Sequence, residues 1–191
     1  LQEQVNLNSK KVNYNNLFMS NKKKTAVLIV AAGSGLRARS ATPKQYLRIG
    51  RKNVLEYTLG NFINVGLVDY ISVVINKNHN ALYASVSSKF TSKKLLPHCI
   101  GGDSRSESVR KGLISIRKHE IDKVLIHDAA RPFTSKRLIE ECIKGLDKYD
   151  VVFPGINVTD TLWKKNKILS QQDFVTGLGP DRDTLVRAQT P

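Results

Sequence analysis

The sequence predicts an α/β protein whose centre is a doubly wound, mostly parallel β-sheet, with a β-arm protruding from it. Apolar runs of strand length alternate with segments whose apolar residues recur at helical spacing, as in repeated β-α-β units. The first run, residues 25–30, is continuous and rich in β-branched side chains. Such a run is expected for a strand buried on both faces of a parallel sheet.

The other elements follow this strand in order. We expect helices over residues 54–65, 81–90 and 138–146, and strands over residues 70–75, 95–100, 124–126 and 151–153. A further helix is predicted to begin at the capping-box pattern of Ser104 and Glu107. Its apolar positions Val109, Leu113 and Ile116 recur at helical spacing, so we expect them to face the core.

The two ends of the chain differ from this pattern. Residues 1–23 are rich in Asn, Lys and Gln without periodicity, so we expect a disordered basic tail before a single domain over residues 24–191. Nearer the other end, possible strands at residues 157–163 and 168–175 surround a lysine-rich turn. They predict a hairpin arm at about residues 157–176.

Composition limits the classes of protein to which the chain can belong. With 191 residues and 40% hydrophobic content it can bury one sizeable core, and its apolar runs are too short to cross a membrane. Cys99 and Cys142 lack the spacing of a metal site or a disulfide framework, so we expect a cytoplasmic protein with Cys142 in its core. The net charge of +15 is dispersed and accompanies no nucleic-acid-binding motif, so we expect a basic surface without a nucleic-acid partner.

A glycine-rich loop follows the first strand. It begins at Ala31 with the letters A-A-G-S-G-L-R, and the motif P-K-Q-Y follows at Pro43. Glycines let backbone N–H groups approach phosphate oxygens, and Arg37 and Lys44 add two cations, so the loop suits a nucleoside triphosphate. A dinucleotide-binding turn fits the glycine spacing, but Pro43 would break the helix that such a turn needs. The G-K-[ST] of a Walker motif does not follow the loop.

Four segments are predicted to lie where strands end, at residues 33–44, 101–108, 127–132 and 159–161. The carboxyl ends of parallel strands share one edge of the sheet, and ligands bind at that edge in open α/β folds. Asp128 directly follows a buried strand, where its carboxylate needs a partner. A Mg²⁺ ion that bridges it to phosphates would supply one, but so would an ion pair with Arg131 or a helix N-cap, and the sequence leaves these open.

Taken together, the motifs resemble those of a known family. They are A-A-G-x-G-x-R with P-K-Q-Y, G-G-x-x-R-x-x-S-V-x-x-G-L from Gly101, H-D-A-A-R-P from His127, D-T at Asp160, and R-x-x-x-x-x-x-Q-T-P from Arg182. In this order they are similar to the 2-C-methyl-D-erythritol 4-phosphate cytidylyltransferases, whose fold is a Rossmann-like sheet of the nucleotidyltransferase type. The resemblance implies transfer of a cytidylyl group from CTP to methylerythritol phosphate, with release of pyrophosphate, in the non-mevalonate route to isoprenoids.

The resemblance also implies roles for the matching residues. Arg37 and Lys44 would be catalytic, Asp128 would hold Mg²⁺, and Thr161 and Arg182 would bind methylerythritol phosphate. CTP would be bound by small and polar residues of two loops: Ala31, Ala32, Gly33, Gly35, Gly102, Asp103 and Ser108. As in the family, we expect a homodimer formed through the arm.

Two departures from the family pattern leave alternatives open. Trp163 stands where the family has a lysine near the Asp-Thr pair. We also expect the chain, which ends at Pro191, to lack a last family segment that carries a second metal-binding Asp and a phosphate-binding Lys. One alternative is a ribitol-5-phosphate cytidylyltransferase, which shares the glycine loop and P-K-Q. The other is a truncated nucleotide-binding protein without activity.

Overall fold

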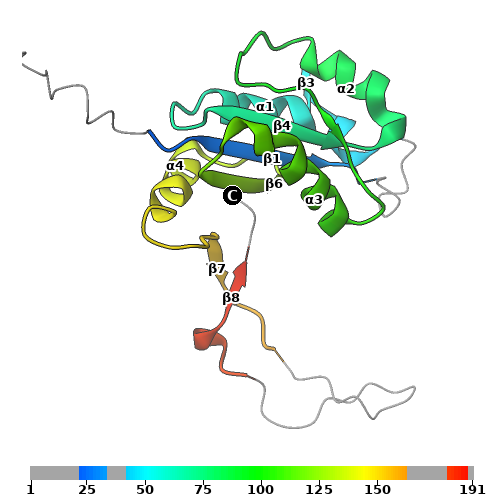
Figure 1. Ribbon diagram of the computed structural model, residues 1–191. Helices are drawn as coiled ribbons and strands as arrows, with labels where there is room; N and C mark the ends of the chain where they lie inside the picture. Colours follow the sequence, from blue (N-terminus) through cyan, green and yellow to red (C-terminus); the bar gives the residue numbers. More distant parts are fainter. Residues whose placement is uncertain (1–21, 34–41, 163–179, 189–191) are drawn as a thin grey trace, which may run out of the picture.

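The computed structural model describes residues 22–33, 42–162 and 180–188, and at its centre lies a four-stranded parallel sheet (Figure 1). The strands are β1 (Thr25–Ala31), β4 (Tyr70–Ile75), β5 (Cys99–Ile100) and β6 (Lys123–Asp128), in the spatial order β5-β4-β1-β6. β1 is flanked by strands on both sides, and Val27 and Leu28 are fully buried. The predicted parallel sheet with a fully buried first strand is confirmed.

Helices cover both faces of this sheet (Figure 1). They are α1 (Val54–Ile63), α2 (Asn80–Ser87), α3 (Arg105–Ile116) and α4 (Lys136–Gly145). Val27 and Ile29 of β1 share one core with α1, α2 and α4, whereas Leu28 points to the opposite face, which α3 covers. Because side chains alternate along a strand, the apolar run of β1 serves both cores. Within the described ranges, no helix is long and apolar enough to span a membrane.

The buried face of α3 differs from the prediction. Ile116 is buried as expected, but Leu113 is 37% exposed and Val109 only half-buried. The positions that face the sheet are instead Ser108 and Gly112, together with Ile116 at the same helical spacing. The prediction that Leu113 faces the core is therefore wrong.

Gly112 explains this rotation of α3. A Cβ atom at this position would lie 2.5 Å from Cδ1 of Leu28 and 2.7 Å from Cγ2 of Val74. Such distances are shorter than any ordinary contact between carbon atoms, so the helix can approach the sheet this closely only through a glycine. A position without a side chain carries no hydrophobic signal, so the apolar pattern of α3 pointed to its neighbour.

Two predicted strands also differ from the structure. Of residues 95–100, only the last two form β5, because Pro97 has no N–H group to continue the ladder. Residues 151–153 form no strand, since they lead from α4 to the arm without a neighbouring strand. The other predicted elements of the sheet and of its helices agree with the structure to within a few residues, and Cys142 is buried as predicted.

A small hairpin precedes α1. Its strands are β2 (Arg48–Ile49) and β3 (Lys52–Asn53), and Gly50 in the turn has a φ of 61°, a left-handed conformation that favours glycine. Asn53 then begins α1 with a capping box, because its side chain accepts a hydrogen bond from the Glu56 N–H while the Glu56 carboxylate accepts one from the Asn53 N–H.

The arm leaves the body of the molecule after α4 (Figure 1). Its base is closed by β7 (Gly155–Asn157), which pairs antiparallel with β8 (Val186–Ala188). The strand predicted over residues 157–163 is wrong for residues 158–162. The strand predicted at residues 168–175, like nearly all of the expected tail, lies outside the described residues.

Candidate active site

The carboxyl ends of the parallel strands are in register along one edge of the sheet. Asp128 of β6 pairs with Val30 of β1, and Ala31 pairs with Ile75 of β4, which is in turn in register with the end of β5. The described parts of three of the four predicted strand-end segments therefore lie side by side, as expected. The fourth, residues 159–161, lies on the arm instead, because β7 pairs with β8 and not with the sheet.

Gln45 holds the base of the glycine loop. Its buried side-chain amide donates one hydrogen bond to the carbonyl oxygen of Ala31 at 2.7 Å and another to that of Gly33 at 3.0 Å. Both hydrogens of the amide nitrogen are thereby used. The short 3-10 turn Lys44–Tyr46 is thus tied to the end of β1, which keeps the exposed Lys44 beside the loop.

The glycine loop itself is described only at its start. Gly35 and Arg37 lie outside the described residues, so their roles stay predictions. Gly33 is exposed and Ala32 half-buried, and the carbonyl oxygen of Ala32 accepts a hydrogen bond from Nδ2 of Asn76 at 3.4 Å. Asn76 directly follows β4, so the loop is held from the neighbouring strand as well.

A second loop, between β5 and α3, packs against the first. A Cβ atom on Gly101 would lie 2.6 Å from Cβ of Ala32 and 2.7 Å from Oγ of Ser108, so this contact requires glycine. The buried Ser108 hydroxyl accepts a hydrogen bond from the Gly102 N–H at 3.1 Å. Ala32, Gly102 and Ser108, three of the residues predicted to bind CTP, are thus brought together.

The start of α3 fixes the backbone of this second loop. As predicted, Ser104 is the N-cap, and its Oγ accepts from the Glu107 N–H at 3.1 Å. The Glu107 carboxylate accepts from the Asp103 N–H at 3.0 Å, one residue earlier than in a capping box. This hydrogen bond, with that from Lys111, holds the pKa of Glu107 below its usual range. Asp103 is therefore anchored by its backbone, while its side chain stays exposed.

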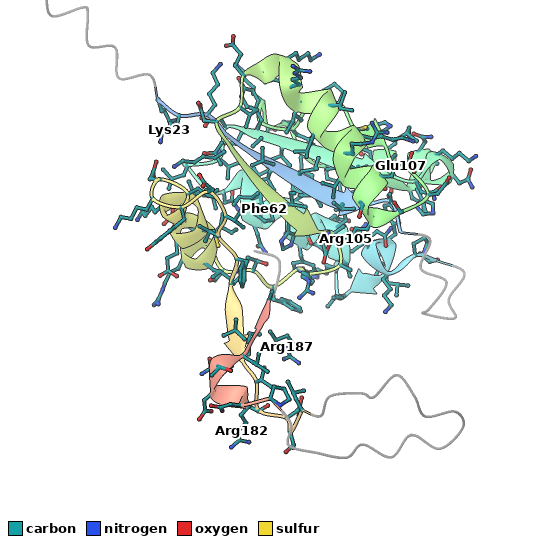
Figure 2. The ribbon with its side chains drawn as sticks, turned by 60° about the horizontal axis from the view of Figure 1, so that its bottom comes forward. Lys23, Phe62, Arg105, Glu107, Arg182 and Arg187 are labelled. Atoms are coloured by element: carbon teal, nitrogen blue, oxygen red, sulfur yellow. The ribbon has the colours of Figure 1, made fainter. Side chains whose placement is uncertain are left out.

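Two guanidinium groups bind the carboxylate of Asp128. Arg105, the first residue of α3, donates to Oδ1 from Nε at 3.1 Å and from Nη2 at 2.9 Å, and Arg131 donates to Oδ2 from Nε at 3.3 Å. The ion pair with Arg131 is one of the alternatives that the sequence leaves open, whereas the contact from Arg105, at the start of α3 (Figure 2), is not among them. The sequence does contain an indication of the Arg105 contact. The helix dipole disfavours a cation in the first turn of a helix, so an arginine at that position is expected to have an anionic partner.

His127 points the other way from Asp128, into the core. Its ring is fully buried at a centroid distance of 4.8 Å from the Phe62 ring, and its Nε2 donates to the carbonyl oxygen of Arg131 at 3.0 Å. Burial lowers the pKa of His127 to about 4, so the ring is neutral at pH 7. Its role is thus to fix the turn after β6 from inside.

Helix α1 supports the same turn. The Thr58 hydroxyl donates to the carbonyl oxygen of Ala129 at 2.9 Å, and Nδ2 of Asn61 donates to that of Pro132 at 2.7 Å. With the bond from His127, three side chains hold the carbonyl oxygens of Ala129, Arg131 and Pro132. The turn that carries Asp128 is therefore rigidly placed, as a binding site requires.

Thr161 and Arg182 lie on the arm. Both are exposed, and Nη1 of Arg182 donates to the carbonyl oxygen of Thr159 at 3.5 Å, which links the two sides of the arm. Residues 157–160 and 185–187, with Leu162, line a hollow of about 370 Å³ here. Figure 2 shows Arg182 on the arm, away from Arg105 at the sheet. Within one chain, these two predicted acceptor-binding residues are not brought to the glycine loop.

Acidic and metal-binding side chains are sparse at this edge. Among the residues that the structure describes, no three of His, Cys, Asp and Glu are grouped as they would be to hold a metal ion by themselves. Asp128 is the predicted metal ligand, and its side chain is 32% exposed. Water and the oxygens of a bound phosphate are further ligands that a Mg²⁺ ion at Asp128 would accept.

Comparison with known proteins agrees with these motifs. The family model of 2-C-methyl-D-erythritol 4-phosphate cytidylyltransferase (IspD) matches residues 25–191. A bifunctional IspD/IspF enzyme of Wolbachia pipientis wMel is 43% identical over 74% of this chain and 36% of its own length. A 2-C-methyl-D-erythritol 4-phosphate cytidylyltransferase of Clostridium botulinum is 36% identical over 88% of this chain and 71% of its own length.

Solved structures give the same result. The 4-diphosphocytidyl-2C-methyl-D-erythritol synthase of Anaerococcus prevotii is 29% identical and superimposes with a TM-score of 0.72 over 89% of this chain and 69% of its own. The bifunctional IspDF of Campylobacter jejuni has a TM-score of 0.63 at 27% identity, over 88% of this chain and 40% of its own. The chain spans only about two fifths of the length of its bifunctional relatives. The match over the whole sheet, its loops and the arm shows that the chain belongs to the 2-C-methyl-D-erythritol 4-phosphate cytidylyltransferase family.

Proposed function

We propose that this chain transfers the cytidylyl group of CTP to 2-C-methyl-D-erythritol 4-phosphate. An oxygen of the acceptor phosphate attacks the α-phosphorus of CTP and forms a new P–O bond, while the bond from that phosphorus to the pyrophosphate oxygen breaks in line. The products are 4-diphosphocytidyl-2-C-methyl-D-erythritol and pyrophosphate. Family membership supports this reaction, and the observation that carries it is the meeting of the segments at Ala32, Gly101 and Asp128 on one sheet edge.

The charges at this edge suit a triphosphate. Asp128 and Asp103 contribute two negative charges, whereas Arg105, Arg131 and Lys44 contribute three positive ones, and the ion pair of Glu107 with Lys111 adds no net charge. The excess of positive charge favours a polyphosphate ligand and the charge that develops on pyrophosphate as it leaves. Arg37 and Lys44 would act on that charge, and no covalent intermediate with the protein is needed.

The two packed loops suit the cytidine. Ala31, Ala32 and Gly33 on one side, and Gly102, Asp103 and Ser108 on the other, are small or polar, so a flat base can lie against their backbone. Hydrogen bonds from the Gln45 amide to Ala31, and from the Gly102 N–H to the Ser108 hydroxyl of α3, hold these segments in place before the nucleotide binds. Such preorganisation reduces the entropy that binding must overcome.

Asp128 is the proposed Mg²⁺ ligand. Mg²⁺ in proteins is commonly held by one or two carboxylates and the phosphates of the substrate, which fits a single carboxylate among cations. When bound, the ion would neutralise charge on the phosphate oxygens. Asp128 would hold it, and the turn fixed by His127, Thr58 and Asn61 would keep the carboxylate in position.

The acceptor is proposed to bind between two copies of the chain. Thr161 and Arg182 suit a phosphate by their chemistry, but they lie on the arm, and Arg182 lies away from Arg105 at the sheet edge of its own chain (Figure 2). An arm that reaches the sheet edge of a second copy would complete that copy's site, and the homodimer would bury Ile156 and Val186, which are 48% and 57% exposed.

The unpaired thiols of Cys99 and Cys142 support a reducing, cytoplasmic location.

The reaction is tested by pyrophosphate release from purified chain with CTP and Mg²⁺, comparing methylerythritol phosphate, ribitol 5-phosphate and no acceptor. We expect release with the first acceptor only, and its loss in Lys44→Met. Pyrophosphate release with ribitol 5-phosphate only would identify that compound as the acceptor in place of methylerythritol phosphate. Binding of CTP without release in any mixture would contradict the proposed transfer and favour a nucleotide-binding protein without activity.

The shared site is tested by mixing Lys44→Met with Arg182→Met at an acceptor concentration far below KM, where Lys44→Met should be inactive and Arg182→Met should keep about a tenth of the normal activity or less. A mixed dimer would have one site in which both residues are intact, so random reassociation should restore about a quarter of the normal activity. Each variant alone sets the background. A mixture no more active than its components, at a protein concentration where sedimentation detects mixed dimers, would contradict the shared site.

A further inference from the structure

The Asp128 carboxylate is bound most closely by a cation from another element of the fold. Nε and Nη2 of Arg105 both donate to a single oxygen, Oδ1, at 3.1 and 2.9 Å. Arg131, three residues further along the same turn, donates to Oδ2 at 3.3 Å. The two oxygens together offer about four acceptor positions, so three of them are already taken.

The position of Arg105 allows its guanidinium group to move away from Asp128. Its side chain is 55% exposed, and it stands at the first residue of α3, where the backbone N–H dipoles repel a positive charge. Neither the core nor the cap at Ser104 depends on its guanidinium group. The contact with Asp128 compensates for an unfavourable position, and a bound anion would compensate for it equally well.

We propose that Arg105 and the divalent metal ion compete for Oδ1 of Asp128, so that the metal binds this carboxylate together with a nucleoside triphosphate and only weakly without one. This inference deepens the proposed function and rests on it. A metal ion on Oδ1 would place a double positive charge beside the guanidinium group that binds the same atom, and the two would repel each other strongly at that distance. Arg105 must therefore move when the metal arrives.

A triphosphate removes the conflict. Its oxygens would offer the displaced, planar guanidinium group a bidentate partner, and Asp128 would be left to hold the metal. Arg105 is thereby a positioning residue with two partners, a carboxylate before nucleotide binding and phosphate oxygens after it. The exchange makes metal binding and nucleotide binding cooperative, because each removes the obstacle to the other.

The test is a titration of the purified chain with Mn²⁺ alone, in which the free ion is measured by electron paramagnetic resonance. We expect Arg105→Met to bind Mn²⁺ about tenfold more tightly than the normal chain, because a charge-assisted contact no longer competes. Arg105→Lys, which keeps a charge but not the forked contact, should lie between them. Arg110→Met, an exposed arginine on the same helix, is the matched control and should leave Mn²⁺ binding unchanged.

The same variant should have the opposite effect on the nucleotide. With Mn²⁺ saturating, Arg105→Met should bind CTP several-fold more weakly, because the triphosphate loses its guanidinium partner. Adding Asp128→Asn to Arg105→Met should abolish the gain in Mn²⁺ affinity. Circular dichroism and thermal unfolding check that each variant is folded.

The proposed competition would be overturned if folded Arg105→Met bound Mn²⁺ no more tightly than the normal chain does. This includes the case in which neither the variant nor the normal chain binds Mn²⁺ over the titration. The proposal would also be overturned if the gain in Mn²⁺ affinity persisted in the double variant that carries both Arg105→Met and Asp128→Asn. None of these results depends on turnover, so they are separate from a failure of cytidylyl transfer, which the pyrophosphate assay reports.

Discussion

His127 and Asp128 are neighbours in β6 that point to opposite faces of the sheet. The His127 ring packs on Phe62 under α1, whereas the Asp128 carboxylate binds Arg105 at the start of α3. Side chains alternate along a strand, so a slip of β6 by one residue would bury the carboxylate and turn the ring toward the sheet edge. The register of β6 with β1 is thus a condition for the site, and the core contact of His127 helps to enforce it.

Gln45→Glu is expected to weaken CTP binding about tenfold or more and to lower the melting temperature. A carboxylate has nearly the size of the amide but cannot donate to the carbonyl oxygens of Ala31 and Gly33, which would face a negative charge instead. Calorimetric titration with CTP and thermal unfolding measure the two effects. Asn78→Asp, at an exposed position, is the control for the added charge. Equal effects of both variants would contradict the role of the Gln45 hydrogen bonds in holding the loop.

Gly112→Ala is expected to reduce the free energy of unfolding by about 1–3 kcal/mol, because the added methyl group would overlap Leu28 and Val74. Urea unfolding followed by circular dichroism gives the change. Gly60→Ala is the matched control: it also lies within a helix, nothing stands within 4 Å of its added Cβ, and it should stabilise by about 0.5–1 kcal/mol. Destabilisation by Gly60→Ala and not by Gly112→Ala would refute this packing.

Asp69→Asn is expected to lower stability at pH 7 but to make little difference near pH 2. Burial acts to raise the pKa of Asp69, but the hydrogen bond from the Thr25 N–H and the ion pair with Lys22 outweigh it and leave the pKa below its ordinary value of 3.8. The ionised form therefore stabilises the fold above that value, and this contribution is lost as the pH falls through the lower folded-state pKa.

Thermal unfolding of Asp69→Asn and the normal chain between pH 2 and 7 measures this convergence. The exposed Asp150→Asn serves as the control for removing a carboxylate from the surface. A difference between Asp69→Asn and the normal chain that stays constant over the whole range would show that the charge of Asp69 plays no part.

Arg182→Met is expected to raise the KM for the acceptor about tenfold or more while leaving CTP affinity unchanged, since only the proposed contact of its guanidinium group with the acceptor phosphate is lost. Initial rates at varied acceptor concentration and a CTP titration separate the two. Arg137→Met, an exposed arginine on α4, is the control. A matching loss of CTP affinity would place Arg182 at the nucleotide instead.

Much of the site could be predicted because its residues follow strands. The position of Asp128 at the end of β6, and of Gly101 directly after β5, depends on where each strand ends, and local apolar patterns indicate those ends well. The edge at which they meet then follows from parallel pairing alone.

The missed features depend on contacts between distant parts of the chain. The bond from Arg105 to Asp128 requires the approach of α3 to the sheet, and that approach depends on Gly112, which carries no hydrophobic signal. The pairing of β7 with β8 joins two short, exposed segments on either side of a long excursion, and no local pattern marks them as partners.

The pairing of β7 with β8 also makes residues 158–185 an exchangeable cassette. Both of its ends meet at one antiparallel ladder, so its length and sequence can change without moving the four-stranded sheet to which that ladder is attached. If the acceptor binds through Thr161 and Arg182, as we propose, selection for a different acceptor can act on this segment while the nucleotide half is inherited intact. Grafting the corresponding segment of a relative onto this ladder would then change the acceptor preference.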